Sequence, residues 1–150
     1  MKVKRSNINR REAAGPCCDW FLMVAAPIAL GAAIYIVFRS RQLLVFQWLD
    51  ATDLLGTTMI VRSYVAGVCL PNCILYSLPD GLWVLAGTNC MLLIWHGRPP
   101  AFWLLATFVL AAAGEVGQAI RLVPGTYEHA DMVAYTVGFL LADFRRGQTR

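Results

Sequence analysis

Charged residues are scarce in this chain of 150 residues, and their scarcity argues against a soluble domain. Asp, Glu, Lys and Arg together make up 15% of the residues, whereas 58% are hydrophobic. An ordinary soluble domain carries about 25% charged residues, most of them on the surface that faces water. A chain with so little charge needs lipid as its solvent, so we expect an integral membrane protein.

Histidine is nearly absent, and the cysteines stand at spacings that match no zinc site. The chain has two histidines and five cysteines, and neither histidine lies at a ligand spacing from a cysteine pair. We therefore expect no metal and no cofactor. Cys69 and Cys73 are near enough in sequence for a disulfide, but their spacing does not decide whether one forms.

Basic side chains outnumber acidic ones, yet they do not follow one polar face as they would in a nucleic-acid-binding protein. The net charge is +4 at pH 7, and the cations sit in short clusters beside apolar runs. Such clusters are typical of the cytoplasmic ends of membrane spans. We therefore expect membrane lipids as partners and no nucleic acid.

Long uncharged runs predict the fold class. Trp20 to Phe38 is nineteen residues without a charge, which as a helix is about 28 Å long and nearly matches the hydrocarbon thickness. Together with later runs it predicts an all-α, polytopic membrane helical bundle with about four transmembrane helices plus an interfacial or re-entrant segment. In a single domain over 20–144, between basic cytoplasmic tails at 1–19 and 145–150, the expected spans are about 20–38, 78–96, 101–122 and 130–144.

The stretch from Gln42 to Pro79 is mixed in polarity and is expected to lie outside the membrane or at its surface. Leu43 to Leu49 is densely apolar and is a candidate for a helix that lies on the membrane. Tyr64 to Leu78 is uncharged, but Pro71 and Asn72 interrupt it at its centre. Such a break favours a re-entrant or surface segment over a straight span.

The distribution of cations predicts the orientation. With four spans, nine Lys and Arg residues fall on the side of the two termini and four on the other side. A fifth span at 64–78 would leave six on one side and seven on the other. Because Lys and Arg accumulate in cytoplasmic segments, four spans with both termini in the cytoplasm are favoured.

Polar residues interrupt the third expected span. An ionised carboxylate at the position of Glu115 costs at least about 2.5 kcal/mol if it faces lipid, so we expect it to have polar company. Gln118 follows three residues later on the same helical face. Gly114 and Gly117 are small and would let another helix approach closely.

The next helix carries a matching polar stripe. Asp131, Tyr135 and Gly138 recur at helical spacing, and Pro124 and Gly125 suit a tight reversal between the two helices. Both helices then bring polar groups to the outer rim of the bundle, where the four-span arrangement also places Asp80. The candidate ligand-binding residues are therefore Asp80, Glu115, Gln118, Tyr127, Asp131 and Tyr135, next to Glu128 and His129.

These residues allow a structural and a functional interpretation. In the structural one, Glu115 and Gln118 hydrogen-bond neighbouring helices or loop backbone, and Asp131 caps its own helix. In the functional one, they form a pocket that holds a headgroup or passes protons, because intramembrane carboxylates mark sites. Asn89, inside the second span, is expected to be a helix-packing residue.

Several segments resemble the second half of VanZ-like membrane proteins, whose pattern is Glu-x-x-Gln, a Pro-Gly turn, and an Asp and a Gly on the last helix. The likeness covers about Leu78 to Leu141, and the segments that carry it are Leu78–Trp83, Gly114–Gln118, Pro124–Tyr127 and Asp131–Gly138. Thr126 and Tyr135 depart from it, since many members have arginine and asparagine there. The resemblance implies a bacterial inner-membrane protein of four to five helices. Some relatives are linked to teicoplanin resistance.

Three functions remain open at this point. The favoured one is a non-enzymatic envelope protein that binds a lipid or a cell-wall precursor at the outer rim. An accessory subunit of a larger membrane complex is a second, because the Gly- and Ala-rich stretch before Glu115 could pack against a partner helix. An enzyme on lipid-linked substrates, with Glu115 and Asp131 as acid and base, is a third, but no nucleophile motif or phosphate-binding loop accompanies them.

Overall fold

A computed structural model describes residues 20–41, 44–123 and 127–148. Over these ranges the regular elements are helices and there is no strand, which confirms the all-α class. The expected tail at 1–19 and the Pro124–Gly125 reversal lie outside the described residues. With η denoting a π-helix, the elements are η1 (Phe21–Ala25), α2 (Ala26–Phe38), α3 (Leu44–Ala51), α4 (Leu55–Tyr64), η2 (Cys73–Ser77), α5 (Leu78–Ile94), α6 (Ala101–Ala119) and α7 (His129–Gln148).

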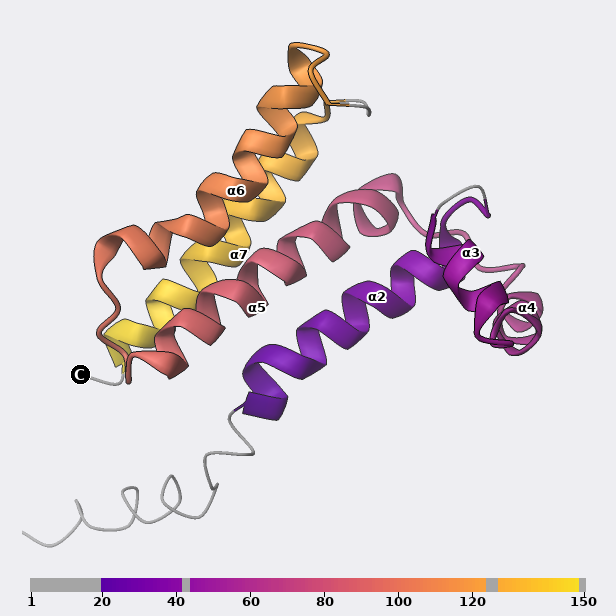
Figure 1. Ribbon diagram of the computed structural model, residues 1–150, viewed down its shortest axis with the longest axis horizontal. Helices are drawn as coiled ribbons and strands as arrows, with labels where there is room; N and C mark the ends of the chain where they lie inside the picture. Colours follow the sequence, from indigo (N-terminus) through magenta and orange to yellow (C-terminus); the bar gives the residue numbers. More distant parts are fainter. Residues whose placement is uncertain (1–19, 42–43, 124–126, 149–150) are drawn as a thin grey trace, which may run out of the picture.

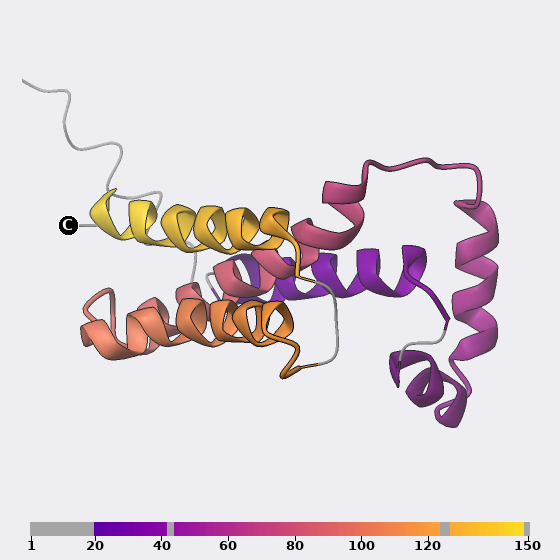
Figure 2. The same ribbon diagram turned by 90° about the horizontal axis from the view of Figure 1, so that it is seen from above.

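The helices α2, α5, α6 and α7 run side by side in alternating directions (Figures 1 and 2). α5 is central: it packs against α2 on one side and α6 on another, and its most extensive contact is with α7. α3 and α4 lie beyond one end of the bundle, next to the last turn of α2. We call this the rim end; there α2 and α6 end, and η2–α5 and α7 begin.

Three helices are long and apolar enough to cross a membrane, namely Phe21–Phe38, Cys73–Ile94 and Ala101–Ala119. The first agrees with the expected span at 20–38. α7 is long enough to cross a membrane, but it is not apolar enough, because polar and charged residues occupy both of its ends. The fourth span therefore stays a prediction.

Several helix boundaries differ from expectation. The second span begins at Cys73, five residues before the expected 78, so only 65–71 remains as a nonhelical connection within the segment expected to be re-entrant. The break at Pro71 and Asn72 is real, but it starts the helix instead of dividing a surface segment. α6 ends at Ala119 instead of 122, and α7 continues to Gln148, so most of the expected tail at 145–150 is helical.

Each π-helical segment ends just before a helix that has a proline in its first turn. η1 precedes Pro27 and η2 precedes Pro79. Proline has no N–H to donate and its ring crowds the carbonyl four residues earlier, so a wider turn relieves the clash. A carbonyl in that wider turn becomes available to another helix, and Asn89 on α5 uses one: its side-chain amide lies 3.1 Å from the carbonyl oxygen of Met23. The expected packing role of Asn89 is thus confirmed.

Glycines bring α5 and α7 into backbone contact. A Cβ atom on Gly81 would lie 2.8 Å from the carbonyl oxygen of Ala134, and one on Gly138 would collide with the carbonyl of Gly81. The expected role of Gly114 and Gly117 in helix approach is wrong. A Cβ on Gly114 would meet nothing within 4 Å. A Cβ on Gly117 would meet the side chain of Val123, which follows α6 in the chain and belongs to no other helix.

Candidate functional site

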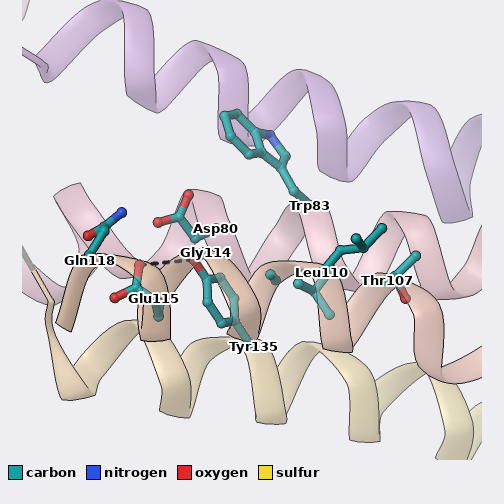
Figure 3. A pocket seen from close by; sticks show the side chains of 10 residues that line it. Asp80, Trp83, Thr107, Leu110, Gly114, Glu115, Gln118 and Tyr135 are labelled. Atoms are coloured by element: carbon teal, nitrogen blue, oxygen red, sulfur yellow. Dashed lines mark hydrogen bonds between the residues drawn. The ribbon is translucent and has the colours of Figure 1, made fainter. Parts of the chain in front are cut away.

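A groove of about 480 Å³ runs between α5 and α6 at the rim end, with one residue from α7 (Figure 3). Its walls change character along α6. Near the rim end they are polar, and farther into the bundle they are apolar or weakly polar, over about 16 Å of helix from Gln118 to Thr107. The lining residues are Asp80, Trp83 and Val84 of α5, Thr107, Leu110, Ala111, Gly114, Glu115 and Gln118 of α6, and Tyr135 of α7.

Glu115 is the most deeply buried of the polar lining residues, at 4% exposed. Its Oε1 accepts a hydrogen bond from the Tyr135 hydroxyl at 3.4 Å, and its Oε2 accepts one from the backbone N–H of Glu128, also at 3.4 Å. This is the bonding to a neighbouring helix and to loop backbone that the structural interpretation anticipates. Both distances lie at the long end of the hydrogen-bond range, so the carboxylate keeps capacity to accept a stronger donor.

Asp131 stands behind the groove on α7, four residues before Tyr135 and on the same helical face. It is only 8% exposed, and its Oδ1 has no hydrogen-bond partner among the described residues. Its charge acts on both Asp80 and Tyr135, which line the groove. A buried carboxylate oxygen without a partner is costly, so Asp131 adds unbalanced negative charge behind the groove.

Asp80 brings the third carboxylate to the site, in the first turn of α5. It feels the charges of Asp131 and Glu115 and, on the α2 side, that of Arg39. The guanidinium of Arg39 sits over the rings of Tyr35 and Tyr76, with its carbon 5.0 and 4.6 Å from their centroids. Carboxylates from three different helices, Asp80, Glu115 and Asp131, therefore lie at the rim end, and Arg39 is a cation that acts on Asp80.

The chain matches no protein-family model, no curated protein and no solved structure. Its function is therefore inferred from the geometry of its own side chains.

The structure brings most of the sequence-predicted residues together. Asp80, Glu115, Gln118 and Tyr135 line one groove, and Asp131 is adjacent. Tyr127 does not line it; its ring instead meets the exposed His129 edge-on at 4.8 Å.

Trp83, Thr107 and Arg39 belong to the site or its surroundings but were not among the predicted site residues. Trp83 lies three residues after Asp80, which is helical spacing, and that was the available signal. Arg39 directly follows the first apolar run, and its placement at the same rim as Asp80 could have paired the two by charge. Thr107 carries no sequence signal, because a lone threonine in an apolar helix is usually a packing residue. Its hydroxyl lies 3.0 Å from that of Thr88 on α5, which holds the deep end of the groove together.

Two further chemical features of the described residues bear on function. Cys69 and Cys73 are both free and exposed, so the disulfide that their spacing allowed is not formed. Within the described ranges, no group of three or more His, Cys, Asp or Glu side chains is arranged to hold a metal ion.

Proposed function

We propose that this protein is a multi-pass protein of the bacterial cytoplasmic membrane, similar to VanZ-like proteins, that binds the headgroup of a membrane lipid or lipid-linked cell-wall precursor. The observation that carries the proposal is the change of polarity along one groove. Its rim half offers Asp80, Glu115, Gln118 and Tyr135, and its inner half offers Val84 and Leu110. An amphiphile needs both environments, with the polar head at the membrane surface and the chain below it.

The groove is open on one side, which also fits a lipid ligand. Leu110 is 74% exposed and Trp83 is 42% exposed, so the groove has an apolar flank where lipid tails would lie. A water-soluble ligand would leave this apolar half uncovered. A lipid ligand would continue from the groove into the bilayer without further cost.

The four-span arrangement is part of the proposal. Exposed apolar residues form one stripe on the outer face of α7, opposite the stripe that faces α5, namely Val133, Val137, Leu140, Leu141 and Phe144. Such a stripe supports contact with hydrocarbon even though the polar ends of α7 lower its average hydropathy. With four spans and the cations mainly at the opposite end, the rim end faces the outside of the cell.

Glu115 hydrogen-bonds Tyr135, and Gly138 contacts Gly81, so three of the segments that carry the likeness to VanZ-like proteins lie together in space. This places the polar residues of those segments at one end of the bundle, where the proposed ligand would bind. The enzymatic alternative gains no support, because the groove lining contains no serine, cysteine or histidine beside the carboxylates. The accessory-subunit alternative predicts a partner on the exposed faces of α2 or α7, where lipid is sufficient to cover the apolar side chains.

Blocking the groove without changing its charge tests the proposal. Gly114 faces the groove and has open space around its Cβ position, so Gly114→Leu should fill the groove. Gly56→Leu is the matched control, since Gly56 is a helical glycine in α4 that also has nothing within 4 Å. Lipid retained by the purified full chain, measured by mass spectrometry after detergent washing, should fall by about fivefold for Gly114→Leu, as a steric cost of about 1 kcal/mol would produce. Equal retention by both variants, each monodisperse in detergent, would refute the proposal.

A further inference from the structure

We infer that the rim half of the groove takes a cationic ammonium headgroup, which rests on the proposed function and specifies the class of its ligand. The groove lining carries two carboxylates, one amide and one phenol, and it contains no lysine, arginine or histidine. An anionic group such as an isolated phosphate would find no cation in this lining and two carboxylates facing it. A positively charged group would face the two carboxylates and meet no cation in this lining.

Asp131 makes the need for positive charge stronger. Its carboxylate is nine-tenths buried, its Oδ1 has no partner among the described residues, and it lies on the face of α7 that also directs Tyr135 into the groove. A dehydrated carboxylate is stable only when it is protonated or accompanied by a cation. Arg39 provides one positive charge on the α2 side, but its guanidinium is already placed over Tyr35 and Tyr76. Arg39 does not line the groove, so the two lining carboxylates, Asp80 and Glu115, have no cation beside them in the lining.

Among the residues that line the groove, the hydrogen-bonding pattern points to a donor rather than an acceptor as the missing group. Glu115 is held by two bonds of 3.4 Å, which leave its oxygens free to accept a shorter bond. An ammonium group has only donors, and charge-assisted bonds to carboxylates are among the strongest that a site can offer. A hydroxylated headgroup without charge would satisfy the acceptors but leave the excess negative charge in place.

Trp83 provides the aromatic component of an ammonium site. Trp83 lines the groove one helical turn from Asp80, and its indole extends toward α2, where its ring centroid lies 6.0 Å from that of Tyr35 (Figure 3). Gly31 makes this placement possible, because a Cβ there would lie 2.8 Å from the indole nitrogen. Aromatic faces attract ammonium groups, and combining one with carboxylates favours a cation over any neutral group of equal size.

The test compares two lipids that have the same acyl chains and differ in headgroup charge. The full chain in detergent receives an equimolar mixture of phosphatidylethanolamine and phosphatidylglycerol, and bound lipid is counted by native mass spectrometry. We expect phosphatidylethanolamine to be retained over phosphatidylglycerol by about tenfold, the ratio that one charge-assisted hydrogen bond provides. Preference for phosphatidylglycerol, or no preference, would overturn the inference.

Variants that remove one negative charge show which carboxylates cause the headgroup preference. Asp80→Asn and Glu115→Gln should each reduce it to near equality. Glu115→Gln keeps an acceptor for the Tyr135 hydroxyl but loses the one for the Glu128 N–H, so it is compared only when it is monodisperse in detergent. Asp50→Asn, on an exposed carboxylate of α3 outside the groove, is the control and should preserve the preference. If all three variants behave like the parent protein, the ammonium site lies elsewhere and the inference is wrong.

Two outcomes separate this inference from the proposed function. If Gly114→Leu abolishes the binding of both lipids but the parent chain shows no headgroup preference, the groove binds lipid and only the ammonium assignment fails. If free ethanolamine binds as tightly as the lipid, the ligand is a soluble amine; the charge class then stands and the proposed lipid function fails. If the protein binds neither lipid nor ethanolamine, the ammonium assignment and the proposed lipid function both fail.

Discussion

The side-chain amide of Asn89 on α5 donates a hydrogen bond to the backbone carbonyl of Met23, four residues before Pro27. In a regular helix that carbonyl would accept from residue 27, but proline has no N–H to donate. One proline thus creates the acceptor, and a residue 66 positions away in sequence satisfies it. The first span is held to the centre of the bundle by this specific polar contact as well as by apolar packing.

Replacing Asn89 by leucine should destabilise the protein by about 1 kcal/mol, because interhelical hydrogen bonds in membranes contribute about that amount. Restoring the donor with Pro27→Ala should recover part of the loss, since the Met23 carbonyl then has a partner in its own helix. Unfolding in a denaturing detergent titration measures both variants and the double variant. Strictly additive effects would show that the Asn89 amide and the Pro27 position act independently.

Alanine at Gly138 should be far more harmful than alanine at Gly114. A Cβ on Gly138 collides with the backbone of Gly81, whereas one on Gly114 meets nothing. Separating α5 and α7 to relieve the collision should cost about 1–3 kcal/mol or more, and thermal unfolding in detergent should report it as a lower midpoint. Similar midpoints for the two variants would mean that α5 and α7 are not in close contact.

Arg62 should hold α4 against the end of α2. Its Nη1 donates to the carbonyl oxygen of Ile36 at 2.7 Å, and its guanidinium carbon lies 5.3 Å from the centroid of the Phe46 ring on α3. Carbonyls in the last turn of a helix have no intrahelical donor, so this contact completes α2. Arg62→Gln should loosen α3 and α4, by about 1–2 kcal/mol for a lost charged hydrogen bond, and hydrogen exchange over 55–64 should speed up accordingly.

The control for Arg62 is Arg98→Gln, which removes an exposed arginine from the turn between α5 and α6 at the opposite end of the bundle. Exchange over 55–64 should be unchanged in that variant. Accelerated exchange in both would indicate a general loss of positive charge instead of the contact to Ile36.

Labelling of Cys69 and Cys73 would show which side of the membrane the rim end faces. Both thiols are free and exposed at the rim end, so a membrane-impermeant maleimide should label them in intact cells if the rim faces outward. The variant with both cysteines changed to serine should remain unlabelled until the cells are permeabilised. Labelling of the parent chain only after permeabilisation would reverse the proposed orientation.

Much of the fold follows from local sequence, because hydropathy and helix length are properties of single segments. The all-helical class, the first span and the interruption at Pro71 could be predicted in this way. The boundary at Cys73 was missed because Cys73 to Ser77 is only moderately apolar and was grouped with the preceding surface segment. The fourth span is undecided for the same reason: the polar ends of α7 offset its apolar middle.

The sequence by itself determined that this protein has too little charge for water and that carboxylates interrupt its apolar runs, and it predicted that those carboxylates gather toward one end. These follow from composition and from helical spacing, which do not depend on how the helices pack. Only the tertiary structure decided that Gly114 opens onto a groove while Gly81 and Gly138 close a helix contact, and that Trp83 joins Asp80 and Glu115 in one site. These glycines differ in role because the helix that each one faces, if any, is distant in sequence and is known only once the helices have packed.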